Sequence, residues 1–149
     1  MTININNKNN VRNAILYKDL SFKLQGIFFA IRNELGSGYK EKIYQKAFEN
    51  YLRKVGLNFQ KEFPIKVYSS TGEFLGLYRP DFLVEGKIII EIKAKRFLSK
   101  QEVAIVYDYL RNSKYEVAYL VNFGSKRFYF KRLIFTNDLK KWAKNTRKK

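Results

Sequence analysis

Residues 80–93 constrain the fold strongly, because their pattern predicts two strands joined by a tight turn at Glu85-Gly86. Glu91 and Lys93 are two positions apart, so both side chains project from the same face of the second strand. The opposite face carries three branched apolar residues that belong in a core: Ile88, Ile90 and Ile92. A carboxylate and an ammonium group therefore emerge from an otherwise apolar strand.

The length of the turn decides whether Asp81 joins these two charges. A two-residue loop would place Asp81 opposite Ile90 and turn its carboxylate into the core. A three-residue loop over 85–87 places Asp81 opposite Glu91 and leaves only apolar side chains on the core face. Because a slip of one residue would bury a charge, we predict the longer loop or an equivalent bulge. Asp81, Glu91 and Lys93 then share one face.

The rest of the chain divides into helical and strand patterns. Apolar residues spaced by three and four predict helices over 18–35, 40–55 and 99–113, with a short closing helix over 136–145. Period-two or continuous apolar patterns predict strands over 63–68, 74–84, 87–95, 117–123 and 128–135. The order α-α-β-β-β-α-β-β predicts an α/β fold with a mixed central sheet flanked by helices.

The length of 149 residues suits a single domain. We expect a flexible N-terminus over 1–12, one domain over 13–139 and a basic C-terminal tail over 140–149. The longest apolar run is Ile27–Ile31, far short of the roughly 20 residues of a membrane-spanning helix, so no membrane span is expected. The polar first ten residues contain no apolar signal-peptide core, which predicts a cytoplasmic protein.

The charge balance indicates a polyanionic partner. The chain has 30 Lys and Arg against 13 Asp and Glu, a formal net charge of +17. Most of this excess lies outside the basic tail, and nucleic acid is the simplest partner for such a body. Solubility alone is the competing interpretation, and composition does not separate DNA from RNA. A membrane surface is disfavoured because no strongly basic amphipathic helix stands apart from the core.

Two residue types are absent, and their absence narrows the chemistry. Without Cys there is no disulfide, zinc–thiolate site or thiol nucleophile, and without His there is no imidazole base. Acid–base or metal chemistry therefore falls to Asp, Glu, Lys, Tyr or Ser. A ligand set limited to oxygen suits hard cations such as Mg²⁺, Mn²⁺ or Ca²⁺.

The face that carries Asp81 and Glu91 has the character of a metal site. Two carboxylates at one point repel each other unless a cation neutralises them, and Lys93 adds positive charge nearby. A divalent ion would polarise a phosphate and generate hydroxide from water, while Lys93 orients that water or stabilises the transition state. The competing interpretation is an ordinary Lys–Glu pair on an edge strand. Lys95 and Arg96 are candidates for phosphate contacts, with a frayed strand end as the alternative.

These motifs resemble a known group of nucleases. Arg79-Pro80-Asp81 followed by Glu91-Ile92-Lys93 is similar to the signature of the PD-(D/E)XK nuclease superfamily. Residues 38–44 spell G-x-x-E-x-x-Y, the motif of the small GxxExxY proteins of that superfamily. Further similar pieces lie at 34–38, 109–111 and 121–124, so the resemblance covers roughly residues 20–135.

The resemblance implies a restriction-endonuclease-like core that binds Mg²⁺, with Mn²⁺ as a substitute. It implies that Asp81 and Glu91 ligate the metal and serve catalysis with Lys93, and that Glu41 from an early helix completes the cluster. The Ile92 carbonyl is a candidate further ligand. Glu41 has a simpler explanation too, because the helix dipole stabilises a carboxylate in a first helical turn. Tyr44 is interpreted as a packing residue with its hydroxyl at the rim of the site.

We therefore predict a Mg²⁺-dependent nuclease that hydrolyses phosphodiester bonds by metal-activated water, with DNA as the favoured substrate. The first alternative is a catalytically inactive nucleic-acid-binding module with the nuclease fold, and the second is a scaffold whose charge serves solubility. Relatives tend to carry Gln where this chain has Ile105, a departure that bears on activity. A homodimer is a further hypothesis, for which the sequence shows no interface.

Overall fold

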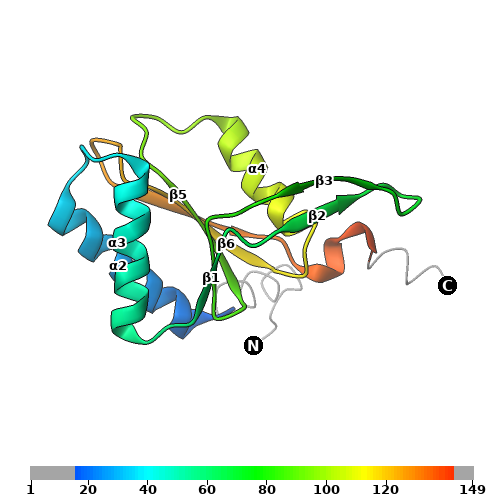
Figure 1. Cartoon of the computed structure of the whole chain (residues 1–149), viewed down its shortest axis with the longest axis horizontal. Coiled ribbons are helices and arrows are strands. Elements are labelled where there is room, and N and C mark those ends of the chain that lie inside the picture. The colour runs from blue at the N-terminus through cyan, green and yellow to red at the C-terminus, as the bar shows by residue number, and fades with distance from the viewer. Residues whose placement is uncertain (1–15, 143–149) are drawn as a thin grey trace, which may run out of the picture.

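The computed structural model describes residues 16–142, which form an α/β arrangement (Figure 1). The predicted flexible segment 1–12 and positions 143–149 of the predicted tail lie outside the described residues. The helices are α2 (Lys18–Leu35), α3 (Glu41–Val55) and α4 (Lys100–Arg111). The strands are β1 (Phe59–Lys61), β2 (Ile65–Tyr68), β3 (Phe74–Tyr78), β4 (Phe82–Val84), β5 (Ile88–Lys93), β6 (Val117–Asn122) and β7 (Tyr129–Ile134).

Five of these strands form the central sheet, in the order β1-β4-β5-β6-β7. β5 and β6 are parallel and the other neighbouring pairs are antiparallel. α4 is the crossover connection that the parallel pair requires. Helices α2 and α3 pack on one face of the sheet and α4 on the other (Figure 1). The predicted α/β class, with a mixed sheet between helices, is confirmed.

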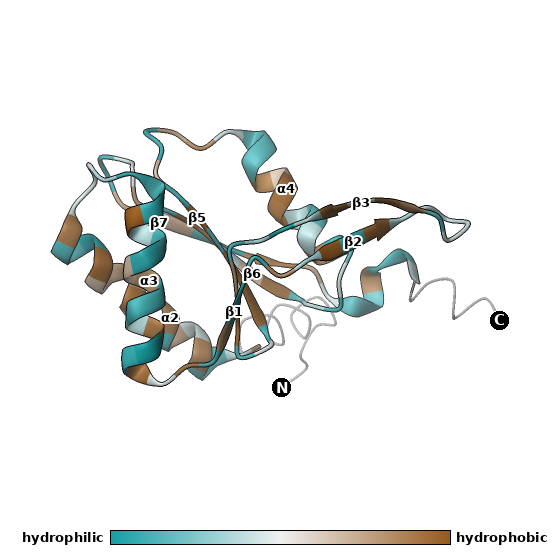
Figure 2. Cartoon of the chain, in the orientation of Figure 1, coloured by the Kyte–Doolittle hydropathy of each residue, from teal (hydrophilic) through white to brown (hydrophobic). Residues whose placement is uncertain are grey.

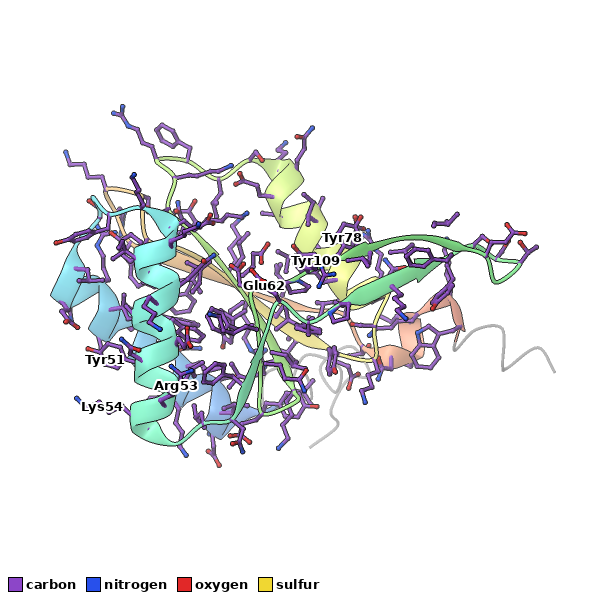
Figure 3. All side chains as sticks on the ribbon, viewed as in Figure 1. Tyr51, Arg53, Lys54, Glu62, Tyr78 and Tyr109 are labelled. Carbon is purple, nitrogen blue, oxygen red and sulfur yellow. The ribbon has the colours of Figure 1, made fainter. Side chains whose placement is uncertain are left out.

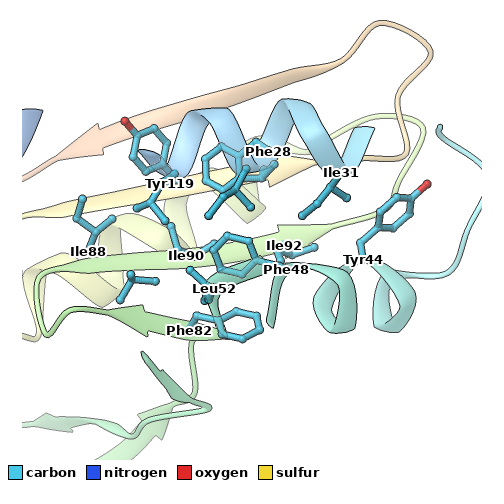
Figure 4. Close-up of a cluster of buried hydrophobic side chains, with 14 of the residues drawn as sticks. Phe28, Ile31, Tyr44, Phe48, Leu52, Phe82, Ile88, Ile90, Ile92 and Tyr119 are labelled. Carbon is cyan, nitrogen blue, oxygen red and sulfur yellow. The ribbon is translucent and has the colours of Figure 1, made fainter. Parts of the chain in front are cut away.

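The larger core lies between the sheet and helices α2 and α3 (Figure 4). Phe28 of α2 is fully buried, and its ring centroid is 5.8 Å from that of Phe48 on α3 and 5.4 Å from that of Tyr119 on β6. The apolar face of β5 packs into this core through the three residues assigned to it above: Ile88, Ile90 and Ile92. The burial of apolar side chains such as these makes the main favourable contribution to the free energy of folding. It also fixes the direction in which Glu91 points.

The opposite face of the sheet is covered as well. Val106 and Leu110 of α4 pack with Ile89 and Leu120 of the sheet in a second core. β2 and β3 form a separate two-stranded sheet that extends from the body and is largely apolar (Figure 2). Helix α4 begins at a capping box. The Ser99 side chain accepts from the Glu102 N–H, and the Glu102 side chain accepts from the Ser99 N–H. On this face of β5, Glu91 is buried under α4, whereas Lys93 at the end of the strand is partly exposed.

The register between β4 and β5 is the predicted one. Val84 pairs with Ile88, so the three residues 85–87 lie outside the ladder. The same register, continued past the start of β4, brings Asp81 opposite Glu91. Positive φ angles of 54° and 62° at positions 85 and 86 provide the tight reversal of the chain. The predicted three-residue loop over 85–87 is thus confirmed.

The strand pattern differs from the prediction in three places. β1 is an additional strand, which pairs antiparallel with β4. The strand predicted over 74–84 is divided at Arg79-Pro80 into β3 and β4, which belong to different sheets. The strand predicted over 63–68 likewise begins only after Pro64. Proline has no N–H to donate to a ladder, so strand pairing stops at both prolines of the chain.

The C-terminal segment also differs from the predicted helix over 136–145. Its described part contains a 3₁₀ turn, η1 (Asn137–Leu139), and helical residues at 141–142, while positions 143–145 of the prediction lie outside the described residues. Lys140, which was assigned to the tail, is 1% exposed and donates to the carbonyls of Ser113 and Tyr115 at 2.7 Å. Burial lowers its pKa to about 8. The chain is therefore anchored to the body as far as Lys140. Within residues 16–142, no helix is long and apolar enough to cross a membrane.

Candidate metal-binding and catalytic site

Asp81 and Glu91 meet just before the first residue of β4. The backbone N–H of Ile92 donates to Asp81 Oδ2 at 2.7 Å, and the N–H of Asp81 donates to Glu91 Oε1 at 3.1 Å. Because strand pairing has stopped at Arg79-Pro80, the N–H of Ile92 has a carboxylate as its partner instead of a neighbouring strand. The strand break therefore positions the Asp81 side chain, and each acidic residue is tied to the backbone of the other strand.

Tyr109 of α4 holds the second carboxylate oxygen of Glu91. Its hydroxyl donates to Glu91 Oε2 at 2.7 Å, and both residues are buried. The ring of Tyr109 lies beside Tyr78 of β3, with centroids 5.4 Å apart (Figure 3). Helix α4 thus fixes the orientation of Glu91 from the face of the sheet that it covers.

Lys93 is the last residue of β5, and its ammonium group lies among acidic side chains. Its Nζ is 3.9 Å from Glu91 Oε2 and 4.0 Å from Glu41 Oε1. Glu41 is the first residue of α3, and its side chain is 42% exposed. The structure therefore brings the predicted residues Asp81, Glu91 and Lys93 together, and Lys93 connects them to Glu41.

The electrostatics of this cluster follow from burial. Burial, and then the charge of Glu91, raise the pKa of Asp81 to about 7, although the hydrogen bond from the Ile92 N–H opposes the rise. Burial also raises the pKa of Glu91, against the hydrogen bond from Tyr109 and the charge of Lys93. The pKa of Tyr109 is raised by burial and by Glu91, so its hydroxyl stays protonated and donates. Two carboxyl groups held close together and largely out of water favour any cation that neutralises them.

This donor set fits a hard divalent cation. The Ile92 N–H donates to one oxygen of the Asp81 carboxylate, Oδ2, and the two oxygens of Glu91 accept from the Asp81 N–H and the Tyr109 hydroxyl. The Ile92 carbonyl lies on the same side of β5 as its N–H, and therefore on the side of Asp81. Within residues 16–142, no group of three or more acidic side chains is arranged to hold a metal ion. The protein donors are thus the two carboxylates and this carbonyl, and the metal contact of Glu41 stays a prediction.

Tyr44 is a packing residue, as predicted, and its hydroxyl binds the loop that precedes α3. The side chain is fully buried, as expected of a packing residue, and its ring stacks on Phe123 at 4.8 Å. Its hydroxyl donates to the Gly36 carbonyl at 2.6 Å and accepts from the Tyr39 N–H at 3.2 Å. Tyr44 therefore shapes the loop that leads into α3, and by this route sets the position of Glu41.

Lys95 and Arg96 lie in the loop between β5 and α4, and both are exposed. The ammonium group of Lys95 forms an ion pair with Glu102 of α4. Arg96 lies over the ring of Phe97, with 5.7 Å from its Cζ to the ring centroid. The loop is thus basic and adjoins the site through Lys93, and phosphate contacts by these two residues stay a prediction.

Two residues that support the site were not assigned a role from the sequence. One is Tyr109, described above. The other is Asn122 at the end of β6, whose side chain accepts from the Lys95 N–H at 3.0 Å and donates to the Lys95 carbonyl at 2.8 Å. A buried Asn directly after the apolar run 117–121 is a signal that could have identified it, because a buried amide needs partners. Tyr109 gives no such signal, since its role depends on how α4 packs.

A mixed sheet between helices, with two acidic side chains and a lysine at the end of one strand, defines the class of protein, and a comparison with family models agrees with it. The family model described as the PD-(D/E)XK nuclease superfamily matches residues 18–133. This chain therefore belongs to the PD-(D/E)XK nuclease superfamily. No curated protein sequence matches the chain.

One solved structure similar to the chain is the crystal structure of SSO0001. The two share 21% sequence identity and a TM-score of 0.46, over 92% of this chain. This chain spans 65% of the length of SSO0001.

Proposed function

We propose that this protein is a Mg²⁺-dependent nuclease of the GxxExxY group, that it acts in the cytoplasm, and that it hydrolyses phosphodiester bonds of DNA. The observation that carries the proposal is the placement of Asp81 beside the buried Glu91, whose Oε1 accepts from the Asp81 N–H at 3.1 Å, with the Lys93 ammonium group 3.9 Å from Glu91 Oε2. Superfamily membership supports nuclease activity, and the net charge of +17 supports a nucleic-acid substrate.

Each residue has a distinct role in the proposed reaction. Asp81 and Glu91 hold the cation, and Tyr109 keeps Glu91 in the orientation that presents it. A bound Mg²⁺ or Mn²⁺ would supply Lewis-acid activation of the phosphate and of a water molecule. Lys93 orients the attacking water or stabilises negative charge on the transition state. Lys95 and Arg96 contact phosphates that flank the scissile bond.

A second candidate is a nucleic-acid-binding module that keeps the fold without hydrolysis. Two features favour it: within residues 16–142 no group of three acidic side chains is arranged to hold a metal ion, and Ile105 stands where the family resemblance leads us to expect Gln. This candidate shares the charge and the salt-dependent binding of the first. It differs only in having no metal-dependent turnover.

Incubation of the purified protein with nucleic acids separates the two candidates. Supercoiled, linear and single-stranded DNA, and a single-stranded RNA, are each incubated with Mg²⁺, with Mn²⁺ and with EDTA. The nuclease proposal predicts cleavage of DNA in Mg²⁺ or Mn²⁺ and none in EDTA. Binding without cleavage on every substrate contradicts it and supports the binding module, and cleavage of RNA alone contradicts the assignment of DNA.

A further inference from the structure

The loop that connects β5 to α4 presents an exposed aromatic ring beside the proposed site. Phe97 is 76% exposed and follows Lys93 by four residues. Phe97 follows Glu91 by six residues, which span about 21 Å at most, so the loop lies within a few nucleotides of the carboxyl groups. Figure 1 shows this loop at the top of the molecule, at the same end as the loop that joins α2 to α3. Single exposed apolar residues are common on proteins, so the surroundings of Phe97 decide its meaning.

The first relevant feature is that this loop is anchored at both ends. Asn122 binds both the N–H and the carbonyl of Lys95, and Gly124 packs directly against the backbone of residues 94 and 95. Ser99, two residues after Phe97, is held by the capping box of α4. The loop therefore presents the ring from fixed supports, which lowers the entropy lost when a ligand binds.

The second feature is the chemistry around the ring. Residues 92–101 contain four basic side chains, one of which, Lys95, forms an ion pair with Glu102 of α4. The guanidinium group of Arg96 lies over Phe97, 5.7 Å from Cζ to the ring centroid. Aromatic rings and guanidinium planes are the two groups on which proteins stack unpaired bases, and neighbouring cations hold the backbone. An aliphatic or acidic loop would offer neither contact.

We infer that Phe97 stacks on an unpaired base, so that single-stranded nucleic acid is the preferred substrate class of the proposed site. This inference rests on the proposed function. In a duplex the faces of the bases are covered by their neighbours, and a ring at the surface reaches them only after unstacking. Stacking accepts every base, so this contact confers strand preference without sequence preference.

Fluorescence anisotropy in EDTA tests the inference without cleavage. A labelled single strand, the duplex of the same length and the same single strand carrying abasic sites are titrated with the parent protein. The variants are Phe97→Ala, Phe97→Trp, which keeps a stacking surface, and the matched control Phe22→Ala. Phe22 is 79% exposed and lies on α2, away from the β5–α4 loop.

The expected result is specific to strand and to base. Phe97→Ala should weaken single-strand binding about 5- to 100-fold and leave duplex binding unchanged, whereas Phe97→Trp and Phe22→Ala should retain parental affinity. Abasic sites should weaken binding by the parent but not by Phe97→Ala. Single-strand binding by Phe97→Ala equal to that of Phe22→Ala, or an equal loss on single strand and duplex, overturns the inference alone. A parent protein that binds neither nucleic acid contradicts the proposed function itself.

Discussion

At the scale of single residues, Asp81 has opposing effects on stability and on the proposed chemistry. Its pKa is raised to about 7 by burial and by Glu91, whereas an Asp in an unfolded chain titrates near 3.9. The folded state therefore binds this proton more tightly than the unfolded state does. It follows that the free energy of unfolding falls as the pH rises from about 4 to about 7, and that the loss persists above that range.

Replacing Asp81 with Asn should remove this loss. Without metal at about pH 8, the free energy of unfolding of Asp81→Asn should exceed that of the parent by on the order of 1–2 kcal/mol, and the difference should vanish near pH 4. Urea unfolding across this pH range measures it. Asp19→Asn, an exposed position in the first turn of α2, serves as the control. A parent that gains stability relative to Asp81→Asn as the pH rises would show that the Asp81 pKa is not raised.

Tyr109→Phe tests the support of Glu91, because it removes one hydroxyl and keeps the ring. Glu91 would lose a hydrogen bond that lowers its pKa, so we expect divalent-cation affinity to fall about tenfold. The free energy of unfolding should fall by about 1–2 kcal/mol. Calorimetric titration with Mn²⁺ and urea unfolding measure the two effects.

Tyr107→Phe on the same helix is the matched control, since its hydroxyl forms no hydrogen bond with any described residue. It should change neither quantity. An equal loss of cation affinity in both variants would place the effect in the packing of α4 rather than in the bond to Glu91.

At the scale of elements, the sequence predicts the register of a strand best where a charged residue interrupts an apolar pattern of period two. The β4–β5 register was predictable because a one-residue slip would have turned Asp81 into the core. β1 was not predictable, because three residues with two exposed side chains are too short for a periodic signal. Division of the strand at Pro80 was foreseeable from the missing N–H alone. The bond from Tyr109 to Glu91 depends on how α4 packs across the sheet, which local patterns do not encode.

Gly124 tests the contact between the end of β6 and the end of β5. A Cβ at Gly124 would lie 2.4 Å from the backbone C of Ala94 and the N of Lys95, so one of the two segments would have to move. Gly124→Ala should lower the free energy of unfolding by about 1–3 kcal/mol and displace the β5–α4 loop. Gly26→Ala in α2, where nothing lies within 4 Å, should instead raise it by about 0.5–1 kcal/mol. Urea unfolding of both variants measures the two changes in the free energy of unfolding. A stabilised Gly124→Ala would contradict the close contact of Gly124 with the backbone of residues 94 and 95.

At the scale of the whole molecule, the net charge of +17 predicts salt-dependent binding of nucleic acid. For duplex DNA, log K should fall linearly with log salt, by about 0.9 for each phosphate contact. Removing residues 143–149, which include four basic side chains, should weaken binding and flatten this slope. The deletion leaves the buried Lys140 anchor in place, so the melting temperature should not change. An unchanged salt slope would show that these residues make no phosphate contact.

The central claim is that Asp81, Glu91 and Lys93 form a metal-dependent cleavage centre. The most direct measurement compares the parent, Asp81→Asn, Lys93→Ala and the control Asp19→Asn, purified identically, for DNA binding in EDTA and DNA cleavage in Mg²⁺. The account predicts that Asp81→Asn binds DNA at least as tightly as the parent, because a negative charge facing phosphate is gone. Its cleavage rate, and that of Lys93→Ala, should fall by about 100- to 1000-fold or more, with Asp19→Asn unaffected. Undiminished cleavage by Asp81→Asn, or a parent that cleaves nothing in Mg²⁺, would contradict the claim.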